Sequence, residues 1–204
     1  MDSNMDSKQC MSRRELLKST CGLAGAAALV SVGGSLSAFA VGGAMPKPLD
    51  KGAPKVGDMF VFGDGPRKDK IVAVEDLVID GPPVAAQAKD AASETARESD
   101  HSTVLLLRLL PEKVPEELKE DAAQGVLAFS AVCTHLGCML TDWVAEKKLF
   151  RCPCHEAMFD PMQAGKSTGE GPVAKALPIL PLKVVEGKLV AADVFSGAVG
   201  PKKG

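Results

Sequence analysis

The sequence predicts an all-β, antiparallel domain that follows an N-terminal signal or anchor helix. Three observations indicate this fold class. Short apolar runs alternate with turns rich in Gly and Pro, stretches with helical periodicity are scarce, and an uncharged segment rich in Gly and Ala follows a pair of arginines. Short strands at this frequency are typical of an antiparallel β domain.

Length and composition narrow the class of protein. The chain has 204 residues, the size of one domain with an appendage. Hydrophobic residues make up 46% and charged residues 25%, which is enough to build a folded core. The net charge of -2 argues against a nucleic-acid partner, which needs a basic surface. Six Cys accompany three His, seven Phe, one Trp and no Tyr, so the spacing of the Cys has to decide their role.

The N-terminal segment is interpreted as a targeting sequence. Arg13 and Arg14 precede 28 uncharged residues, Ser19–Pro46, so the segment resembles a twin-arginine export signal. Cleavage after Ala38-Phe39-Ala40 would release the domain, and retention would leave a membrane anchor. We therefore expect a signal or anchor at 1–45, a linker at 46–56, and a domain at 57–204 on the periplasmic side of a bacterial inner membrane.

Most of the remaining chain is predicted to form strands. The range 85–102 is rich in Ala, Ser and charged residues and is predicted to be a mobile inserted loop. The range 116–124 has helical composition and precedes Gly125, so it is predicted to be a helix. Strands are predicted at 58–62, 70–74, 76–80, 103–110 and 125–132, and hairpins at 143–151 and 182–192.

Two short boxes carry most of the chemistry. They read Cys133-Thr134-His135-Leu136-Gly137-Cys138 and Cys152-Pro153-Cys154-His155, with 13 residues between them. Each box offers one thiolate and one imidazole as ligands, with one thiol to spare. Two thiolates and two imidazoles suit either a tetrahedral zinc ion or one iron-sulfur cluster with asymmetric ligation. The ligand types alone leave both possibilities open.

The two boxes resemble those of the Rieske iron-sulfur proteins, C-x-H-x-G-C and C-x-C-H, and the resemblance covers at least Val126–Val199. It implies a Rieske-type β sandwich with a cluster-binding part at about 130–175. It also implies a [2Fe-2S] cluster, with Cys133 and Cys152 on one iron and His135 and His155 on the outer iron. These histidines would form the edge at which electrons and protons are exchanged.

The resemblance assigns further residues. Cys138 and Cys154 are interpreted as occupying equivalent positions in the two loops and are expected to pair as a disulfide. Leu136, Gly171 and Pro172 are expected to cover the cluster. In place of the Ser and Tyr common in quinol-oxidising relatives, this chain has Ala157 and Phe159. Because hydroxyl groups favour the reduced cluster, we expect a potential in the lower part of the Rieske range, roughly −150 to +300 mV.

Two redox functions follow from the resemblance. The first is the iron-sulfur subunit of a cytochrome bc-type complex, with cytochrome b and c subunits and quinol as partners. The second is the small subunit of a periplasmic molybdenum oxidoreductase resembling arsenite oxidase, with a molybdopterin subunit and a soluble cytochrome c as partners. A structural zinc-binding module is a third, remote alternative. In both redox functions the chain is expected to be an electron-transfer subunit rather than a stand-alone catalyst.

Overall fold

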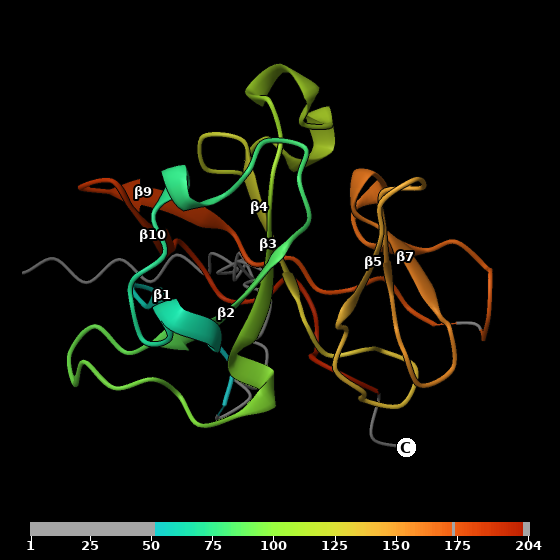
Figure 1. Ribbon diagram of the computed structural model, residues 1–204, viewed down its shortest axis with the longest axis horizontal. Coiled ribbons are helices and arrows are strands. Elements are labelled where there is room, and N and C mark those ends of the chain that lie inside the picture. The colour runs from blue at the N-terminus through green and yellow to red at the C-terminus, as the bar shows by residue number, and fades with distance from the viewer. Residues whose placement is uncertain (1–51, 173, 202–204) are drawn as a thin grey trace, which may run out of the picture. The chain divides into compact units, whose positions relative to one another are not determined.

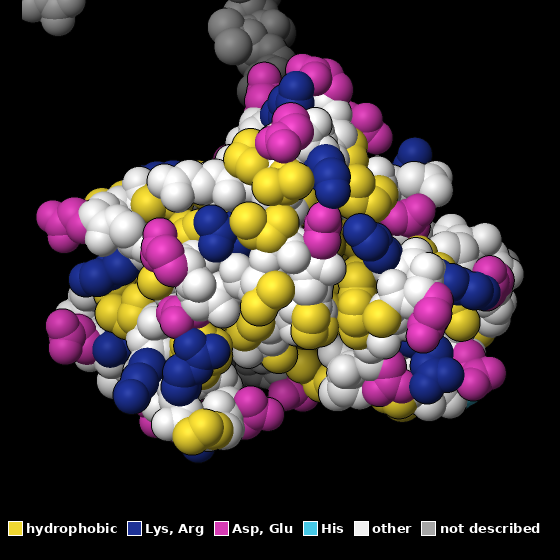
Figure 2. All heavy atoms as spheres, turned by 45° about the horizontal axis from the view of Figure 1, so that its top comes forward, with side chains coloured by type: hydrophobic (Ala, Val, Ile, Leu, Met, Phe, Trp, Pro, Cys, Tyr) yellow, Lys and Arg dark blue, Asp and Glu magenta, His cyan; other side chains and the backbone are white. Residues whose placement is uncertain are grey.

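A computed structural model describes residues 52–172 and 174–201 (Figure 1). The expected leader at 1–45 and most of the expected linker at 46–56 lie outside these ranges. Within them, no helix has the length and apolar character needed to cross a bilayer. On the face drawn in Figure 2, basic and acidic side chains are interspersed, so that face does not present a surface of a single charge sign.

The larger of two antiparallel sheets has six strands in the order β4-β3-β2-β1-β10-β9 (Figure 1). Its strands are β1 (Met59–Phe62), β2 (Val84–Lys89), β3 (Thr103–Arg108), β4 (Val126–Ser130), β9 (Leu182–Val185) and β10 (Lys188–Ala191). The predicted strands at 103–110 and 125–132 and the hairpin at 182–192 are confirmed. In that hairpin Glu186 and Gly187 form the turn with positive φ angles, which matches the right-handed twist of the strands.

The smaller sheet has four strands in the order β5-β6-β7-β8. They are β5 (Asp142–Val144), β6 (Leu149–Arg151), β7 (Met158–Asp160) and β8 (Lys166–Ser167). The hairpin predicted at 143–151 is confirmed as β5 and β6. Six short 3-10 helices complete the described structure: Gly65–Arg67, Val74–Asp76, Asp100–Ser102, Pro111–Lys113, Glu116–Leu118 and Pro161–Gln163.

Two hydrophobic clusters pack on opposite faces of β3 and β4. Val104 and Leu106 belong to the first cluster, which packs on one face of the six-stranded sheet. Leu105 and Leu107 belong to the second, which also contains Phe150 and so joins the two sheets. Because successive residues of a strand point to opposite faces, a strand buried on both faces has a continuous apolar sequence. This explains why the run at 103–110 is apolar without alternation.

The structure corrects three sequence predictions. The range 85–102 is not a mobile loop, because most of β2 lies in it and pairs with both β1 and β3. The range 116–124 does not form a longer helix but only the 3-10 turn Glu116–Leu118, of which Leu118 is the buried residue. The ranges 70–74 and 76–80 make isolated bridges and a 3-10 turn instead of strands.

A buried ion-pair network holds the rest of the 85–102 range. Arg97 donates two hydrogen bonds to Asp58, with Nε to Oδ2 at 2.6 Å and Nη2 to Oδ1 at 2.9 Å, and a third to Asp90 at 2.7 Å. The Asp58 side chain is only 4% exposed. Hydrogen bonding to Asp58 raises the pKa of Arg97, so the guanidinium is charged at every pH at which the protein is folded. The network fixes the loop after β2 against the start of β1.

Candidate metal centre

Both boxes lie on loops at one end of the four-stranded sheet. The first loop, Cys133–Cys138, precedes β5, and the second, Cys152–Ala157, connects β6 to β7. In the first, the Cys133 amide donates to the Cys138 carbonyl at 2.8 Å, and the Gly137 amide donates to the Cys133 carbonyl at 2.9 Å. The second repeats this pattern, from Cys152 to Ala157 and from Glu156 to Cys152, with both bonds at 2.9 Å. The two loops therefore share one backbone conformation.

The fifth residue of each loop adopts a left-handed conformation. Gly137 has φ +87° and Glu156 has φ +60°. Glycine enters this region freely, whereas a residue with a Cβ is disfavoured there. The C-x-H-x-G-C pattern has glycine at the position of Gly137, whereas the second loop has Glu156 in the same conformation, which places a charged, exposed side chain next to His155.

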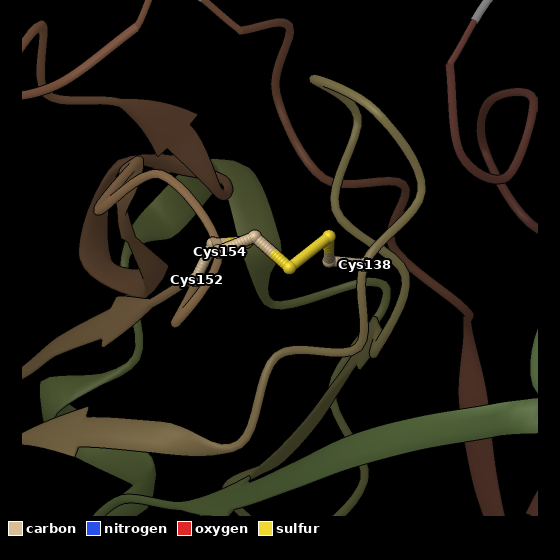
Figure 3. A group of neighbouring side chains, drawn as sticks. All are labelled: Cys138, Cys152 and Cys154. Atoms are coloured by element: carbon tan, nitrogen blue, oxygen red, sulfur yellow. A yellow bond between two sulfur atoms is a disulfide. The ribbon is translucent and has the colours of Figure 1, made fainter.

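A disulfide joins the two loops, as the sequence comparison led us to expect. Cys138 and Cys154 are bonded across a Cα–Cα distance of 6.5 Å, within the usual range for a disulfide. In Figure 3 they reach toward each other from the two loops. The expectation that they occupy equivalent positions is wrong, however. Cys138 is the sixth residue of its loop and Cys154 the third of its own, so the bridge links the loops asymmetrically.

Two other cysteines remain as thiols inside the site. Cys133 is fully buried and Cys152 is 1% exposed, and each begins its loop. Burial raises the pKa of the Cys133 thiol, and the adjacent Cys152 sulfur raises it further, against amide hydrogen bonds that lower it. Cys152 Sγ also lies within 4.8 Å of both disulfide sulfurs. Because bonded sulfurs are not thiolates, the thiols that could bind a metal here are those of Cys133 and Cys152.

Two imidazoles face each other at the outer side of the site. The rings of His135 and His155 have centroids 5.0 Å apart and are nearly perpendicular. His135 is half-buried and His155 is exposed. Nδ1 of His135 is buried and has no hydrogen-bond partner among the described residues. A buried polar nitrogen is normally satisfied, so this orphaned atom fits a metal ligand.

The donor set therefore fits an iron-sulfur cluster with asymmetric ligation. Two buried thiols would hold its inner side and two imidazoles its outer side. When bound, such a cluster accepts and releases one electron at a time. Neutral imidazoles in place of two thiolates reduce the negative charge on the reduced site, which raises its potential above that of an all-Cys cluster.

Further contacts cover the site. Leu136, which belongs to the first loop, is 62% exposed. Gly171 packs so closely on the second loop that a Cβ there would lie 2.7 Å from the Glu156 carbonyl oxygen, and Pro172 follows it. Ala157 and Phe159 are fully buried, and neither side chain has a hydroxyl to donate.

One contact was not expected from the sequence. The hydroxyl of Thr134 donates to the carbonyl of Lys175 at 2.6 Å and so ties the first loop to the chain after Pro172. Its partner is a backbone atom 41 residues away. No residue type at position 175 was needed for this bond, so no motif could have shown it.

Comparison with known proteins identifies the class of this domain. The model of the Rieske [2Fe-2S] domain matches residues 70–181, a range that includes both boxes, the disulfide and the covering residues. The chain belongs to the Rieske [2Fe-2S] domain family, and its cofactor is a [2Fe-2S] cluster.

Two relatives are similar over about half of the chain. The cytochrome bc1 complex Rieske iron-sulfur subunit of Corynebacterium diphtheriae is 39% identical over 124 residues, which are 55% of this chain and 30% of that protein. A Haloferax mediterranei protein, provisionally described as the Rieske subunit of a respiratory nitrate reductase, is 39% identical over 104 residues, 50% of this chain and 46% of its own. The chain thus spans less than half the length of both relatives.

Solved structures are more distant. The ferredoxin of carbazole 1,9a-dioxygenase from Nocardioides aromaticivorans matches with a TM-score of 0.41 and 19% identity, over 67% of this chain and 98% of the ferredoxin. The soluble domain of Rieske protein II from Sulfolobus acidocaldarius matches with a TM-score of 0.36 and 22% identity, over 49% of this chain and 67% of that domain. At these scores the matches carry no functional argument.

Proposed function

We propose that this protein transfers single electrons as the iron-sulfur subunit of a cytochrome bc-type quinol oxidoreductase. Its [2Fe-2S] cluster would be held by Cys133 and Cys152 on the inner iron and by His135 and His155 on the outer iron. The observation that carries the ligand assignment is the pairing of two buried thiols with two facing imidazoles on loops of one conformation. The similarity to bc1 Rieske subunits supports the choice of complex.

The two imidazoles would have unequal roles. His155 lies on an exposed loop, whereas His135 is half-buried. His155 would therefore be the contact point for quinol, with an imidazole nitrogen available for a hydrogen bond to the quinol hydroxyl. His135 would be secondary. The disulfide would hold the two loops together and would not carry electrons.

The location of the protein is part of the proposal. The paired arginines and the following uncharged segment support export by the twin-arginine route, with the domain at 57–204 on the outer side of the inner membrane. If the leader is retained, the protein is anchored beside the cytochrome b and c subunits. Oxidising conditions there would preserve the Cys138–Cys154 disulfide.

A second function has specific support. Phe159 and Ala157 lack the hydroxyls that the resemblance makes usual in quinol-oxidising relatives, and the Haloferax protein is provisionally described as the Rieske subunit of a respiratory nitrate reductase. The chain would then be the small subunit of a molybdenum oxidoreductase, relaying electrons from a molybdopterin subunit to a soluble cytochrome c.

Electron paramagnetic resonance of the full-length protein tests the ligand assignment. We expect the dithionite-reduced protein to give the rhombic spectrum of a [2Fe-2S] cluster with histidine ligands. Metal analysis should find two irons for each chain. One zinc ion for each chain, with no such spectrum, would contradict the proposal.

Purification from the native membrane separates the two complexes. With the bc-type complex, the chain copurifies with a b-type haem, and adding quinol reduces its cluster. Copurification with molybdenum, and a cluster that quinol does not reduce, would instead support the second function.

A further inference from the structure

Each of the two loops contacts a Gly-Pro dipeptide at its fifth residue. On the second loop the dipeptide is Gly171-Pro172, expected from the sequence, and Gly171 has φ +83°. A Cβ on Gly171 would lie 2.7 Å from the carbonyl oxygen of Glu156 and 3.1 Å from the nitrogen of Ala157. The peptide between these residues is therefore covered by glycine backbone.

On the first loop the dipeptide is Gly200-Pro201, near the C-terminus. A Cβ on Gly137 would lie 3.4 Å from Cδ and 3.7 Å from Cγ of Pro201, so the proline ring covers the fifth residue of this loop. Gly200 is buried and has φ +73°, and a Cβ on it would lie 3.3 Å from Cγ1 of Val132. Val132 directly precedes Cys133. The dipeptide thus contacts the chain on both sides of Cys133 and His135.

The segment that carries Gly200-Pro201 is fixed to the six-stranded sheet. Phe195 and Val199 are buried in the same hydrophobic cluster as Val132. The Ser196 amide donates to the Ile179 carbonyl at 2.8 Å, and the Ile179 amide donates to the Ser196 hydroxyl at 2.9 Å. Because these contacts hold the segment on both sides of residue 197, the position of Pro201 is set by the core of the larger sheet.

We propose that Gly200 and Pro201 are positioning residues that brace the first ligand loop as Gly171 braces the second. This inference rests on the proposed ligand roles of Cys133 and His135. The brace would hold the turn in which the Gly137 amide donates to the Cys133 carbonyl. Its loss would therefore let the loop open and release the cluster.

Cluster release measured on substituted and C-terminally shortened chains tests this inference. The test variants are Gly200→Val and a chain that ends at Val199. The matched controls are Gly187→Val and a chain that ends at Pro201. Gly187 has a similar φ of +77°, lies in the β9–β10 turn, and has open space around its Cβ position, so its variant carries the backbone strain without a contact to the loop.

We expect both test variants to release iron to a chelator about tenfold faster than the wild type, which corresponds to about 1.4 kcal/mol of loop opening. Their reduction potential and EPR line shape should change as well, whereas Gly187→Val should lower only the unfolding temperature. Release rates and spectra equal to those of the controls would overturn the inference. If Gly200→Val does not fold, Pro201→Ala replaces it, with the same two outcomes.

These outcomes are distinct from a failure of the proposed function. If the wild-type chain shows no Rieske spectrum, the ligand assignment fails. If the wild type shows the spectrum and the test variants release iron at the wild-type rate, only the inference about Gly200 and Pro201 fails.

Discussion

The first and second ligand loops have the same hydrogen-bonded backbone but differ in exposure. In the first loop Cys133 and Thr134 are buried and His135 is half-buried, whereas in the second the four residues from Pro153 to Glu156 are exposed. One backbone shape therefore serves two purposes. The start of the first loop is buried in the domain, and the second loop presents its imidazole to solvent.

The difference follows from what surrounds each loop. The first loop connects β4 of the larger sheet to β5 of the smaller one, and there Thr134 bonds to Lys175 and Pro201 packs on Gly137. The second loop turns outward at the end of the β6–β7 hairpin, and Gly171 covers only its last peptide. A partner would therefore meet His155 first, which is the basis for its proposed role.

Replacing the thiol that begins each loop is expected to have the largest effect. Cys133→Ser and Cys152→Ser should each abolish cluster binding, because both buried thiols are proposed ligands of one iron. Iron content and EPR of the purified full-length proteins check this. Cys21→Ser, in the expected leader, should retain the full cluster. If one of the two loop variants keeps a normal cluster, the two loops do not contribute equivalent ligands.

Removing the covalent link between the loops should have the next largest effect. The Cys138→Ser/Cys154→Ser double variant loses a bridge of sequence separation 16, worth about 3 kcal/mol in the unfolded-chain model. Denaturant unfolding measures the loss, and the half-life of the visible absorption measures cluster retention. We expect initial binding with faster loss. An unchanged half-life would show that the loops are held without the bridge.

The sequence predicted the strands that are defined by local pattern. The continuous apolar run gave β3, and the turn at Glu186-Gly187 gave the β9–β10 hairpin. It failed for β2, whose six residues are one Val, three Ala, a Gln and a Lys, because all except the Val have little strand preference. Pairing with β1 and β3 on both sides makes this segment a strand, and such pairing cannot be seen in the segment itself.

For the site, the two boxes were sufficient to predict the disulfide but not its geometry. Spacing did not show that the loops match Cys133 to Cys152 in their hydrogen bonds, which places Cys138 and Cys154 at different points of the turn. The contact between Pro201 and Gly137 was also beyond prediction, because it depends on how the C-terminal segment packs. The ligand-type residues could be predicted from the sequence, whereas the contacts between segments distant in the chain could not.

Restoring hydroxyls to the second loop should raise the reduction potential. Ala157→Ser and Phe159→Tyr would each place a donor in the buried region behind Cys152, and such a hydrogen bond favours the more negative reduced state. We expect each variant to have a higher reduction potential than the wild type. A rise of about 60 mV corresponds to a tenfold shift of the one-electron equilibrium toward the reduced cluster. Protein-film voltammetry measures it. A wild-type potential near the top of the Rieske range would contradict the premise that the absence of these hydroxyls lowers the reduction potential.

The smallest effect is expected at the fifth residue of the second loop. Glu156→Gly removes a Cβ from a left-handed position, which relieves about 1 kcal/mol of backbone strain. The lost ion pair with Arg151, 3.7 Å apart and with the Glu156 side chain 73% exposed, contributes little. Glu186→Gly is the matched control, since Glu186 has φ +50° in an exposed hairpin turn.

Both glycine variants should raise the free energy of unfolding by a similar amount. Only Glu156→Gly should also raise the reduction potential, because it removes a negative charge beside His155 and so favours the reduced state. The rise should be at most about 40 mV, the equivalent of the ~1 kcal/mol ceiling for an exposed charge. Equal potentials in the two variants would show that the exposed side of the second loop lies electrostatically outside the redox site, and would weaken the assignment of His155 as the exchange edge.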